Sequence, residues 1–363
     1  MSLSILIVVP NDSLGGAEQY LKMKAKYYAS QEANIKVCFL CSNISNGWDE
    51  FKDDVYVELL YPKSSLEVFG VVFLIKKILS RSSVFDIVFS SHVKVTSLLG
   101  MLIRLNILKT KRFIARESTS VFKRFTRVKL QLYKLMYALG YGKVDVLICQ
   151  TDYMREQLIE ALPHLESKTV TIPNPIDFDL IKQQEVFAVE DDELGDYIVS
   201  AGRLIPEKGF DLLIKAFKKV LLNSSRDIKL LILGEGIERK KLENLIIEER
   251  LEGKVILKGF VNNVYPYFKH AKLCVVSSRV EGFPNVLLQM MSQNECVVST
   301  LCAGGIEEIP GLFTSEADNE NLLLIAIKDA LETEKHETRL LFDVYLGGRT
   351  IAKTVAKIEQ QLD

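Results

Sequence analysis

The sequence predicts a two-domain α/β protein in which each domain is a doubly wound, parallel sheet with helices on both faces. Its 363 residues are enough for two domains that each bury their own core. Short apolar runs rich in β-branched residues alternate with helical patterns from end to end, as expected for parallel sheets covered by helices. A double-proline break, Pro173-Asn174-Pro175-Ile176-Asp177, separates two such series.

The first series begins with the β-branched run Leu3–Val9, which precedes Gly15-Gly16 and an amphipathic pattern over Ala17–Ser30. Further strands of this series are expected at Ile35–Leu40, Asp86–Ser90, Arg112–Ala115, Val144–Cys149 and Thr169–Ile172. Helical patterns lie between them, so residues 1–172 are expected to form an N-terminal Rossmann-like domain.

The second series repeats the architecture without repeating the sequence. Residues 173–196 are expected to form the linker, because Lys182–Asp196 is acid-rich and poorly periodic. Strands follow at Tyr197–Ala201, Lys229–Leu233, Lys254–Lys258, Lys272–Ser277 and Glu295–Ser299. Residues 197–340 are therefore assigned to a C-terminal Rossmann-like domain. Residues 341–363 are expected to form a C-terminal helix that could pack back on the first domain.

The charge of the chain is nearly balanced overall but unevenly distributed. The formal net charge is -1, which by itself indicates no particular partner. From Met101 to Lys143, however, the sequence contains eleven Lys and Arg residues and one acid, Glu117. This stretch therefore carries a charge of +10, and the rest of the chain carries -11. Such a local basic zone indicates an anionic surface as its partner.

Within this zone the sequence has the spacing of an amphipathic helix. The apolar positions are Val121, Phe122, Phe125, Val128, Leu132, Leu135, Met136 and Leu139, and Lys123, Arg124, Arg127, Lys129 and Lys134 fall among them. Such a helix either lies on an anionic membrane or packs on its own domain with a solvated basic face. The charge of segment 104–143 favours the membrane. No nucleic acid is expected, since no aromatic platform or recognition motif accompanies the charge.

Six cysteines are scattered through the chain and are expected to be buried, reduced thiols. Cys38 and Cys41 are two of them, and Cys38 lies within an apolar run, so this C-x-x-C is expected to be structural. The N-terminus lacks a basic n-region and a cleavage site, and no apolar run approaches the length of a membrane span. A cytoplasmic protein is expected, peripheral on the cytoplasmic face of the membrane.

Four motifs of the second domain follow predicted strands, where ligands bind in open α/β sheets. The first is Gly202-Arg203-Leu204-Ile205-Pro206-Glu207-Lys208-Gly209. Arg203 and Lys208 place two cations five residues apart. A guanidinium and an ammonium suit the two phosphates of a diphosphate.

The other motifs are Leu233-Gly234-Glu235-Gly236, Lys258-Gly259-Phe260-Val261 and a longer run from Ser278 to Gln289. In the last, Pro284 is expected at a helix start, which would leave the N–H groups of Phe283, Asn285 and Val286 pointing towards an anion. Glu281 would stand just before this helix, where a carboxylate can accept hydrogen bonds from sugar hydroxyls.

The order and spacing of these motifs resemble the group-1 family of retaining glycosyltransferases, closely over Tyr197–Glu308 and more loosely at Gly15-Gly16-Ala17-Glu18. The resemblance implies the GT-B fold, two Rossmann-like domains facing across a cleft, of which the N-terminal domain, residues 1–172, binds the acceptor. It also implies that Arg203 and Lys208 hold the donor diphosphate, that Glu281 contacts the transferred sugar, and that Gly15 and Gly16 face the donor. The remaining donor-binding residues are expected to be Gly234, Glu235, Val261, Phe283, Pro284, Asn285 and Gln289.

Three departures from the family pattern stand out. Gln289 replaces a glutamate that binds the nucleotide ribose, which would weaken donor binding by about 1 kcal/mol. Ser118 replaces a frequent histidine, so His92 and Glu117 become candidate sugar contacts. The chain is also expected to be shorter than the family norm after Gly304-Gly305-Ile306-Glu307-Glu308.

The expected activity is transfer of a hexose or N-acetylhexosamine from a UDP- or GDP-linked sugar to a glycan or lipid-linked glycan, with retained configuration. No metal and no other cofactor is expected, because no convincing D-x-D motif is present and Asp191-Asp192 lies in the acidic linker. Two alternatives remain open: a catalytically silent donor-binding or scaffold subunit, and a sugar-nucleotide epimerase or hydrolase of the same architecture.

Overall fold

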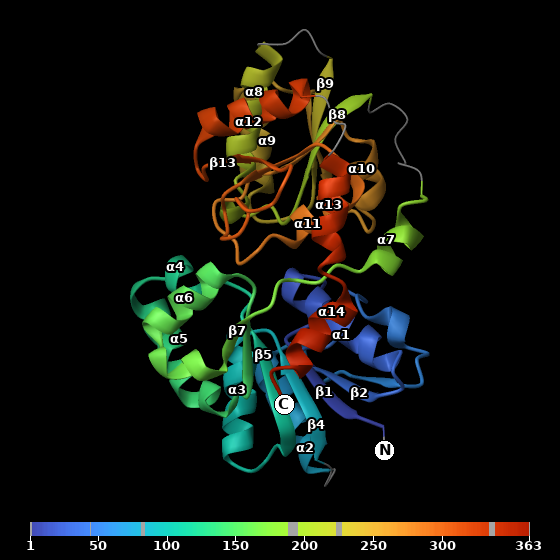
Figure 1. The fold of residues 1–363 in the computed structure, drawn as a ribbon, viewed down its shortest axis with the longest axis vertical. Helices are drawn as coiled ribbons and strands as arrows, with labels where there is room; N and C mark the ends of the chain where they lie inside the picture. The colour runs from blue at the N-terminus through green and yellow to red at the C-terminus, as the bar shows by residue number, and fades with distance from the viewer. Residues whose placement is uncertain are drawn as a thin grey trace. The chain divides into compact units, whose positions relative to one another are not determined.

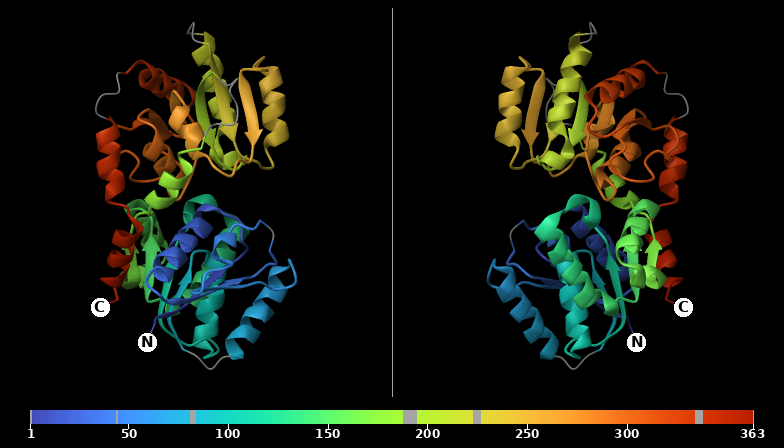
Figure 2. Two further views of the ribbon diagram at one scale, coloured as in Figure 1. Left: turned by 90° about the vertical axis from the view of Figure 1, so that its right-hand side faces the viewer. Right: turned by 90° about the vertical axis from the view of Figure 1, so that its left-hand side faces the viewer.

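The computed structural model describes residues 2–43, 45–80, 84–187, 195–222, 227–333 and 338–362. The chain divides into two compact units, each built on its own sheet (Figures 1 and 2). Unit 1 comprises Met1–Pro175 and Ile351–Asp363, and unit 2 comprises Ile176–Thr350. Both sheets are parallel and covered by helices, which confirms the predicted fold class.

Unit 1 contains a seven-stranded parallel sheet with the order β3-β2-β1-β4-β5-β6-β7. In chain order the strands are β1 (Ser4–Val9), β2 (Asn34–Phe39), β3 (Val57–Leu60), β4 (Phe85–Ser90), β5 (Thr110–Arg116), β6 (Val146–Cys149) and β7 (Thr169–Thr171). The order reverses between β1 and β4, and ligands bind at such switch points in doubly wound sheets.

The helices of unit 1 lie in two layers, one on each face of the sheet. They are α1 (Gly16–Ala29), α2 (Glu67–Leu79), α3 (Val93–Arg104), α4 (Val121–Arg124), α5 (Arg127–Gly140), α6 (Asp152–Ala161) and α14 (Ile351–Glu359), with 3-10 turns η1 (Asp49–Phe51), η2 (Tyr141–Lys143) and η3 (Pro163–Lys168). One core joins α2, α3, α5 and α6 to the sheet, and the other joins α1 and α14 to its opposite face. Successive residues of β1 serve the two cores in turn, because side chains alternate along a strand.

Unit 2 contains a six-stranded parallel sheet with the order β10-β9-β8-β11-β12-β13. In chain order the strands are β8 (Asp196–Ala201), β9 (Ile228–Leu233), β10 (Val255–Gly259), β11 (Leu273–Val276), β12 (Val297–Thr300) and β13 (Phe313–Ser315). Its helices are α7 (Phe178–Gln184), α8 (Phe210–Leu222), α9 (Arg239–Glu248), α10 (Tyr265–His270), α11 (Asn285–Gln293), α12 (Glu320–Glu332) and α13 (Thr338–Gly347), with η4 (Pro206–Lys208). Here the order reverses between β8 and β11.

The observed boundaries differ from the expected ones in the middle and at the end of the chain. The expected linker contains α7, which packs against α10 of unit 2. Residues 188–194 of that linker, including Asp191-Asp192, lie outside the described residues. The last segment forms two helices, and α13 belongs to unit 2 whereas α14 belongs to unit 1.

All six cysteines are buried thiols, as the sequence predicts. No helix in the described ranges is long and apolar enough to cross a bilayer.

Candidate functional site

The first candidate site lies at the switch point of unit 2, where the loops after β8 and β11 carry Lys208 and Glu281. Nζ of Lys208 donates a hydrogen bond to Oε1 of Glu281. The hydroxyl of Ser278 donates to the same oxygen at 3.0 Å. The two charged side chains keep 18% and 19% of their surface exposed, so a ligand can reach both. The structure thus brings together two residues that are 73 positions apart.

Glycines at two neighbouring strand ends make room for this arrangement. Gly202 follows β8 with φ 155°, and a Cβ there would lie 3.3 Å from a side-chain carbon of Lys208. At Gly234, which follows β9 with φ 144°, a Cβ would lie 1.9 Å from the carbonyl oxygen of Gly202. Only glycine fits that approach, because L-residues rarely adopt this conformation and the added atom would overlap the backbone.

Arg203 and Arg279 lie in the same two loops as this pair, after β8 and β11, and they differ in their partners. Arg203 is exposed, and its side chain makes no ion pair with any described residue. Arg279, which the sequence analysis did not select, forms a bidentate pair with Asp211 at 2.8 and 2.9 Å and a further bond of 2.7 Å to Asp318. These bonds raise the pKa of Arg279. They also lower the pKa of Asp211 despite its partial burial, which acts in the opposite direction. Arg279 therefore fixes the loop, and Arg203 remains available.

The loops after β9 and β10 carry Glu235, whose charge is paired, and the apolar residues Phe260 and Val261. Glu235 is exposed and pairs with Arg239 at 2.6 Å. Val261 is half-buried against the core of unit 2, whereas the neighbouring Phe260 is 75% exposed. Phe260 was not singled out as a site residue, because an aromatic side chain after a strand gives no sign of its orientation.

The helix after Glu281 begins one residue later than expected. Pro284 is the N-cap of α11 and Asn285 is its first residue, and the proline side chain makes no capping hydrogen bond. Phe283 is buried beneath the guanidinium of Arg349, whose carbon lies 5.2 Å from the ring centre. The uncapped end gives α11 backbone N–H groups and a positive dipole end suited to an anion.

Gln289 lies on the second turn of α11 and faces a buried tyrosine. Its Nε2 lies 3.3 Å from the hydroxyl of Tyr265, and burial raises the pKa of Tyr265 to about 12. The amide is half-buried, which leaves part of it open to a ligand.

In unit 1 the switch point carries a different pair, Glu18 and His92. Gly15 is the N-cap of α1, Gly16 is its first residue, and His92 is the N-cap of α3. Nε2 of His92 lies 3.0 Å from Oε1 of Glu18, and the two side chains are 24% and 10% exposed. A Cβ at Gly15 would lie 2.6 Å from the carboxylate of Glu18, so glycine lets Glu18 turn back over the helix end.

Glu117 is a candidate sugar contact in the sequence, and the structure places its side chain inside unit 1. Glu117 is 2% exposed, and its two oxygens accept hydrogen bonds of 2.8 Å from the hydroxyls of Tyr137 and Tyr141. Burial raises the pKa of Glu117 to about 7. The side chain is thus enclosed among the tyrosines of the core of unit 1.

The Pro-Asn-Pro break also has a structural role that the sequence did not indicate. Asn174 is buried and accepts a hydrogen bond of 2.6 Å from Arg116, while its own amide donates to Gln150 at 2.8 Å. Arg116 donates a second bond of 3.0 Å to Ser91, and its guanidinium lies 4.5 Å from the ring centre of Tyr20. Asn174 thus ties the end of unit 1 to a buried arginine.

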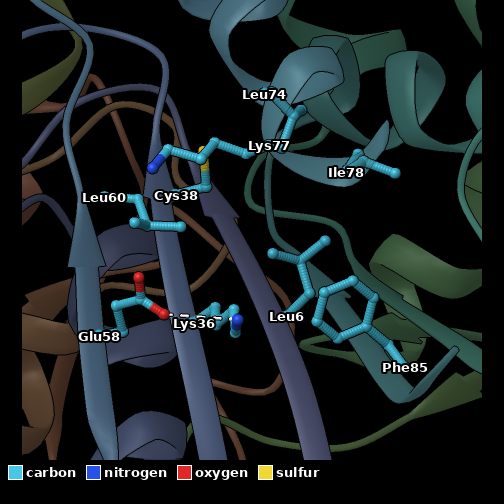
Figure 3. A pocket seen from close by; sticks show the side chains of 9 residues that line it. All are labelled: Leu6, Lys36, Cys38, Glu58, Leu60, Leu74, Lys77, Ile78 and Phe85. Atoms are coloured by element: carbon cyan, nitrogen blue, oxygen red, sulfur yellow. Dashed lines mark ion pairs between the residues drawn. The ribbon is translucent and has the colours of Figure 1, made fainter. Parts of the chain in front are cut away.

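A hollow in unit 1 lies apart from all of these residues (Figure 3). It is formed by one side of α2, strands β1 to β3 and the start of β4, with Leu6, Leu60, Leu74 and Phe85 among its apolar lining. Lys36 and Glu58 lie side by side on β2 and β3 and pair at 3.4 Å. None of the predicted site residues lines it.

The described residues contain no group of three or more His, Cys, Asp or Glu arranged to hold a metal ion.

Fold and site together define a GT-B protein with a cation–carboxylate pair at the switch point of its second sheet. The family model of group 1 glycosyl transferases matches residues 182–340, and that of glycosyltransferase family 4 matches residues 14–180. The C-terminal part of the chain, residues 182–340, thus belongs to the group 1 family of glycosyltransferases.

Two curated relatives illustrate the similarity. N-acetylgalactosamine-N,N'-diacetylbacillosaminyl-diphospho-undecaprenol 4-alpha-N-acetylgalactosaminyltransferase of Campylobacter jejuni is 35% identical over 207 residues, which cover 56% of this chain and 55% of the relative. The lipopolysaccharide core biosynthesis glycosyltransferase LpsE of Rhizobium meliloti is 32% identical over 133 residues, 37% of this chain and 36% of the relative. The chain spans about half the length of curated relatives that it matches, with 55%, 44% and 51% for three of them.

Solved structures share the fold over nearly the whole chain. Anabaena Alr3699/HepE in complex with UDP and glucose has a TM-score of 0.79 at 18% identity, covering 99% of each chain. Sucrose-phosphate synthase from Thermosynechococcus elongatus also has a TM-score of 0.79, at 15% identity over 99% of this chain and 98% of that one. At such identities the likeness establishes the fold alone.

Proposed function

We propose that this chain transfers a hexose or N-acetylhexosamine from a nucleoside diphosphate sugar to a glycan or lipid-linked glycan, with retained configuration. The observation that carries the proposal is the partly exposed pair of Lys208 and Glu281 at the switch point of unit 2. UDP accompanies the related Anabaena structure, and the Campylobacter relative is named for a lipid-linked acceptor, so both chemistries occur among similar proteins.

In this proposal, Lys208 and Arg203 bind the donor diphosphate and stabilise the charge that develops on the leaving phosphate. The uncapped start of α11, with Phe283, Pro284 and Asn285, adds backbone donors and its dipole. Glu281 orients the sugar through its hydroxyls while Ser278 and Lys208 hold one carboxylate oxygen.

The nucleoside is bound by the surrounding loops. The amide oxygen of Gln289 accepts a hydrogen bond from a ribose hydroxyl. Gly234, Glu235 and Val261 provide the loop surface around the nucleotide. Gly15 and Gly16 supply the donor-facing loop of unit 1, and His92 contacts sugar. We keep UDP and GDP as the two candidate nucleotides.

The proposed chemistry uses neither a protein nucleophile nor a metal ion. The acceptor hydroxyl attacks the face from which the diphosphate leaves, and the leaving phosphate oxygen takes its proton. Two protein cations neutralise the developing charge, so EDTA should leave turnover unchanged. Loss of turnover in EDTA, with recovery on addition of Mg²⁺ or Mn²⁺, would refute metal independence.

We also propose that the protein works on the cytoplasmic face of a membrane, held by its basic segment 104–143 on anionic lipid. The backbone of α4 and all of α5 lie in this segment, although the side chains of Lys123 and Arg124 are outside the described residues. Attraction to a bilayer of negative surface potential contributes about 1 kcal/mol for each cation near the surface.

Donor turnover tests the proposal directly. The chain is incubated with a panel of UDP- and GDP-sugars, with and without lipid-linked glycan acceptors, and the free nucleoside diphosphate is measured. Acceptor-dependent release supports a transferase, and the anomeric configuration of the product, read by NMR coupling constants, decides retention. Lys208→Ala should reduce release about 100-fold or more, whereas Lys254→Ala, which removes an exposed ion pair with Asp227 in the same unit, is the matched control.

Two other outcomes would replace the proposal. Nucleotide binding without turnover, in the parent and equally in Gln289→Glu, would indicate a donor-binding scaffold subunit. An epimerised sugar nucleotide formed without acceptor would indicate an epimerase.

A further inference from the structure

Helix α5 turns an apolar stripe away from its own domain. Val128, Leu132, Leu135 and Leu139 follow one another at helical spacing on its outer side and are 84%, 51%, 53% and 42% exposed. The inner side of the helix is buried through Tyr137 and through Gly140, which packs against the backbone of α3. The sequence pattern alone left open whether these apolar residues pack inward or face a membrane.

Helix α2 shows the same arrangement in a different part of the chain. Val68, Phe69, Val72 and Leu79 are 73%, 57%, 46% and 65% exposed. On the opposite side of the helix, Gly70 approaches the carbonyl of Leu40, and Leu74 and Ile78 are buried. Helix α2 lies outside the basic segment, so nothing in the charge pattern indicated it.

Both helices belong to one layer of unit 1. Leu74 and Ile78 of α2 and Tyr137 of α5 enter the same core, together with α3, whereas α1 and α14 cover the opposite face of the sheet (Figure 1). Because both apolar stripes oppose the buried sides of their helices, both point outward from this layer.

The charges on α2, α3 and α5 identify the partner, whereas α6 of the same layer carries the exposed acids Asp152, Glu156 and Glu160 and is not part of the docking face. Helices α3 and α5 contain no Asp or Glu. Their exposed cations are Lys94, Arg104, Arg127, Lys129 and Lys134, and α2 adds Lys76 and Lys77 against one acid, Glu67. Apolar side chains flanked by cations match the interface of an anionic bilayer, where acyl chains lie beneath negative headgroups.

Helix α13 of unit 2 provides the contrast. Leu340 and Val344 are 68% and 71% exposed there, but Arg339 and Asp343 pair across the same turn at 2.7 Å. A mixed-charge surface of this kind has no preference for anionic lipid, so exposure of apolar residues alone does not define the docking face.

We propose that the layer of α2, α3 and α5 docks on an anionic phospholipid bilayer and that the apolar stripes of α2 and α5 enter its interface. This inference rests on the membrane location proposed above. It changes the mode of attachment from charge attraction alone to insertion, and it adds a second helix as a contact.

The test is partition of the full chain onto vesicles of phosphatidylcholine with phosphatidylglycerol, measured by co-sedimentation. The variants are Val128→Ser with Leu132→Ser in α5, Val68→Ser with Val72→Ser in α2, and Leu340→Ser with Val344→Ser in α13 as the matched control. We expect each of the first two pairs to reduce the partition coefficient at least tenfold and the α13 pair to leave it unchanged.

Salt separates insertion from charge attraction, because the Debye length falls to about 3 Å at 1 M salt. The parent should retain vesicle binding at that salt concentration, and the α5 and α2 variants should lose it. Equal partition of parent and both variants would overturn the inference, as would a parent dimer that the variants convert to monomer. Nucleotide affinity, measured in parallel, should be the same in every variant, so failure of the docking face is distinguishable from failure of the donor site.

Discussion

Each of the two units has a glutamate in a loop that follows a central strand of its sheet, and the two glutamates differ in burial. Glu281 of unit 2 is partly exposed and shares one oxygen between Lys208 and Ser278. Glu117 of unit 1 is enclosed, and two tyrosine hydroxyls occupy its oxygens. A carboxylate at a strand end can bind a ligand only if the fold leaves it within reach.

Two lysines repeat the contrast. Lys208 has a carboxylate partner and a solvent-facing surface. Lys24, on α1 of unit 1, is 0% exposed, and its ammonium makes no hydrogen bond within the described part of the chain. Burial, with the nearby charge of Arg116, lowers the pKa of Lys24 to about 7. These charged groups of unit 1 thus affect stability, and those of unit 2 are placed to affect binding.

The largest effect that this comparison predicts is at Lys208. Lys208→Ala removes a cation from the proposed diphosphate site, and loss of one preorganised donor typically costs about 100-fold or more in turnover. The expected result is a fall of that size in nucleoside diphosphate release, with a matching loss of UDP or GDP affinity by calorimetry. Thermal stability should change little. Unaltered turnover in this variant would contradict the assignment of the charged groups of unit 2 to ligand binding.

Glu117→Ala should act on stability instead. The substitution leaves the hydroxyls of Tyr137 and Tyr141 buried without their acceptor, at a cost of about 1–3 kcal/mol in the free energy of unfolding. Denaturant unfolding measures the loss, and nucleotide affinity should remain that of the parent. A variant with parental stability and lost turnover would place Glu117 in the site after all.

Glu117 also predicts a dependence of stability on pH. The pKa of Glu117 is raised to about 7 in the folded state. Its contribution to the free energy of unfolding is therefore fully present below about pH 4.5, the ordinary pKa of a glutamate, and is lost as the pH rises towards 7. Unfolding free energies measured between pH 4.5 and 7 should fall with pH more steeply for the parent than for Glu117→Gln. Identical slopes would contradict the prediction.

Lys24→Met should stabilise the protein modestly. Methionine fills similar volume without a buried ammonium, and such replacements gain about 1 kcal/mol or more at neutral pH. For a unit of this size, that corresponds to a rise in Tm of about 2–4 °C. Lys26→Met, half-exposed on the same helix, is the control and should leave Tm nearly unchanged. A lower Tm for Lys24→Met would mean that the ammonium has a stabilising partner.

The smallest effect is expected at Gln289. Gln289→Glu restores a charged acceptor beside Tyr265, and a charge-assisted bond to ribose would tighten nucleotide binding by about 1 kcal/mol, roughly fivefold. Titration calorimetry with the preferred nucleotide measures the gain. Weaker binding by the variant would assign Gln289 a role other than ribose recognition.

Much of the fold was predictable because its long strands are buried on both faces and form continuous apolar runs. Strands β3 and β13 were not predicted, because they have only four and three residues and lie at the edges of their sheets. The linker assignment missed α7, a helix of seven residues that is stabilised by packing on α10 and has too few turns to show a period.

The site was predictable only where its residues belong to local motifs. Lys208 and Glu281 were found separately, and their contact follows from the adjacency of β8 and β11. The pairing of Glu18 with His92 and the burial of Glu117 depend on packing between segments that are far apart in the chain. Local sequence motifs carry no information on such packing.

The placement of α14 has a consequence for synthesis. Its residues Val355 and Ile358 complete a core whose strands are made at the very start of the chain. All of unit 2 is translated in between, so it can fold while unit 1 still lacks one helix. During that interval the part of the sheet that α14 later covers is exposed, and a chaperone that binds apolar surface could bind there.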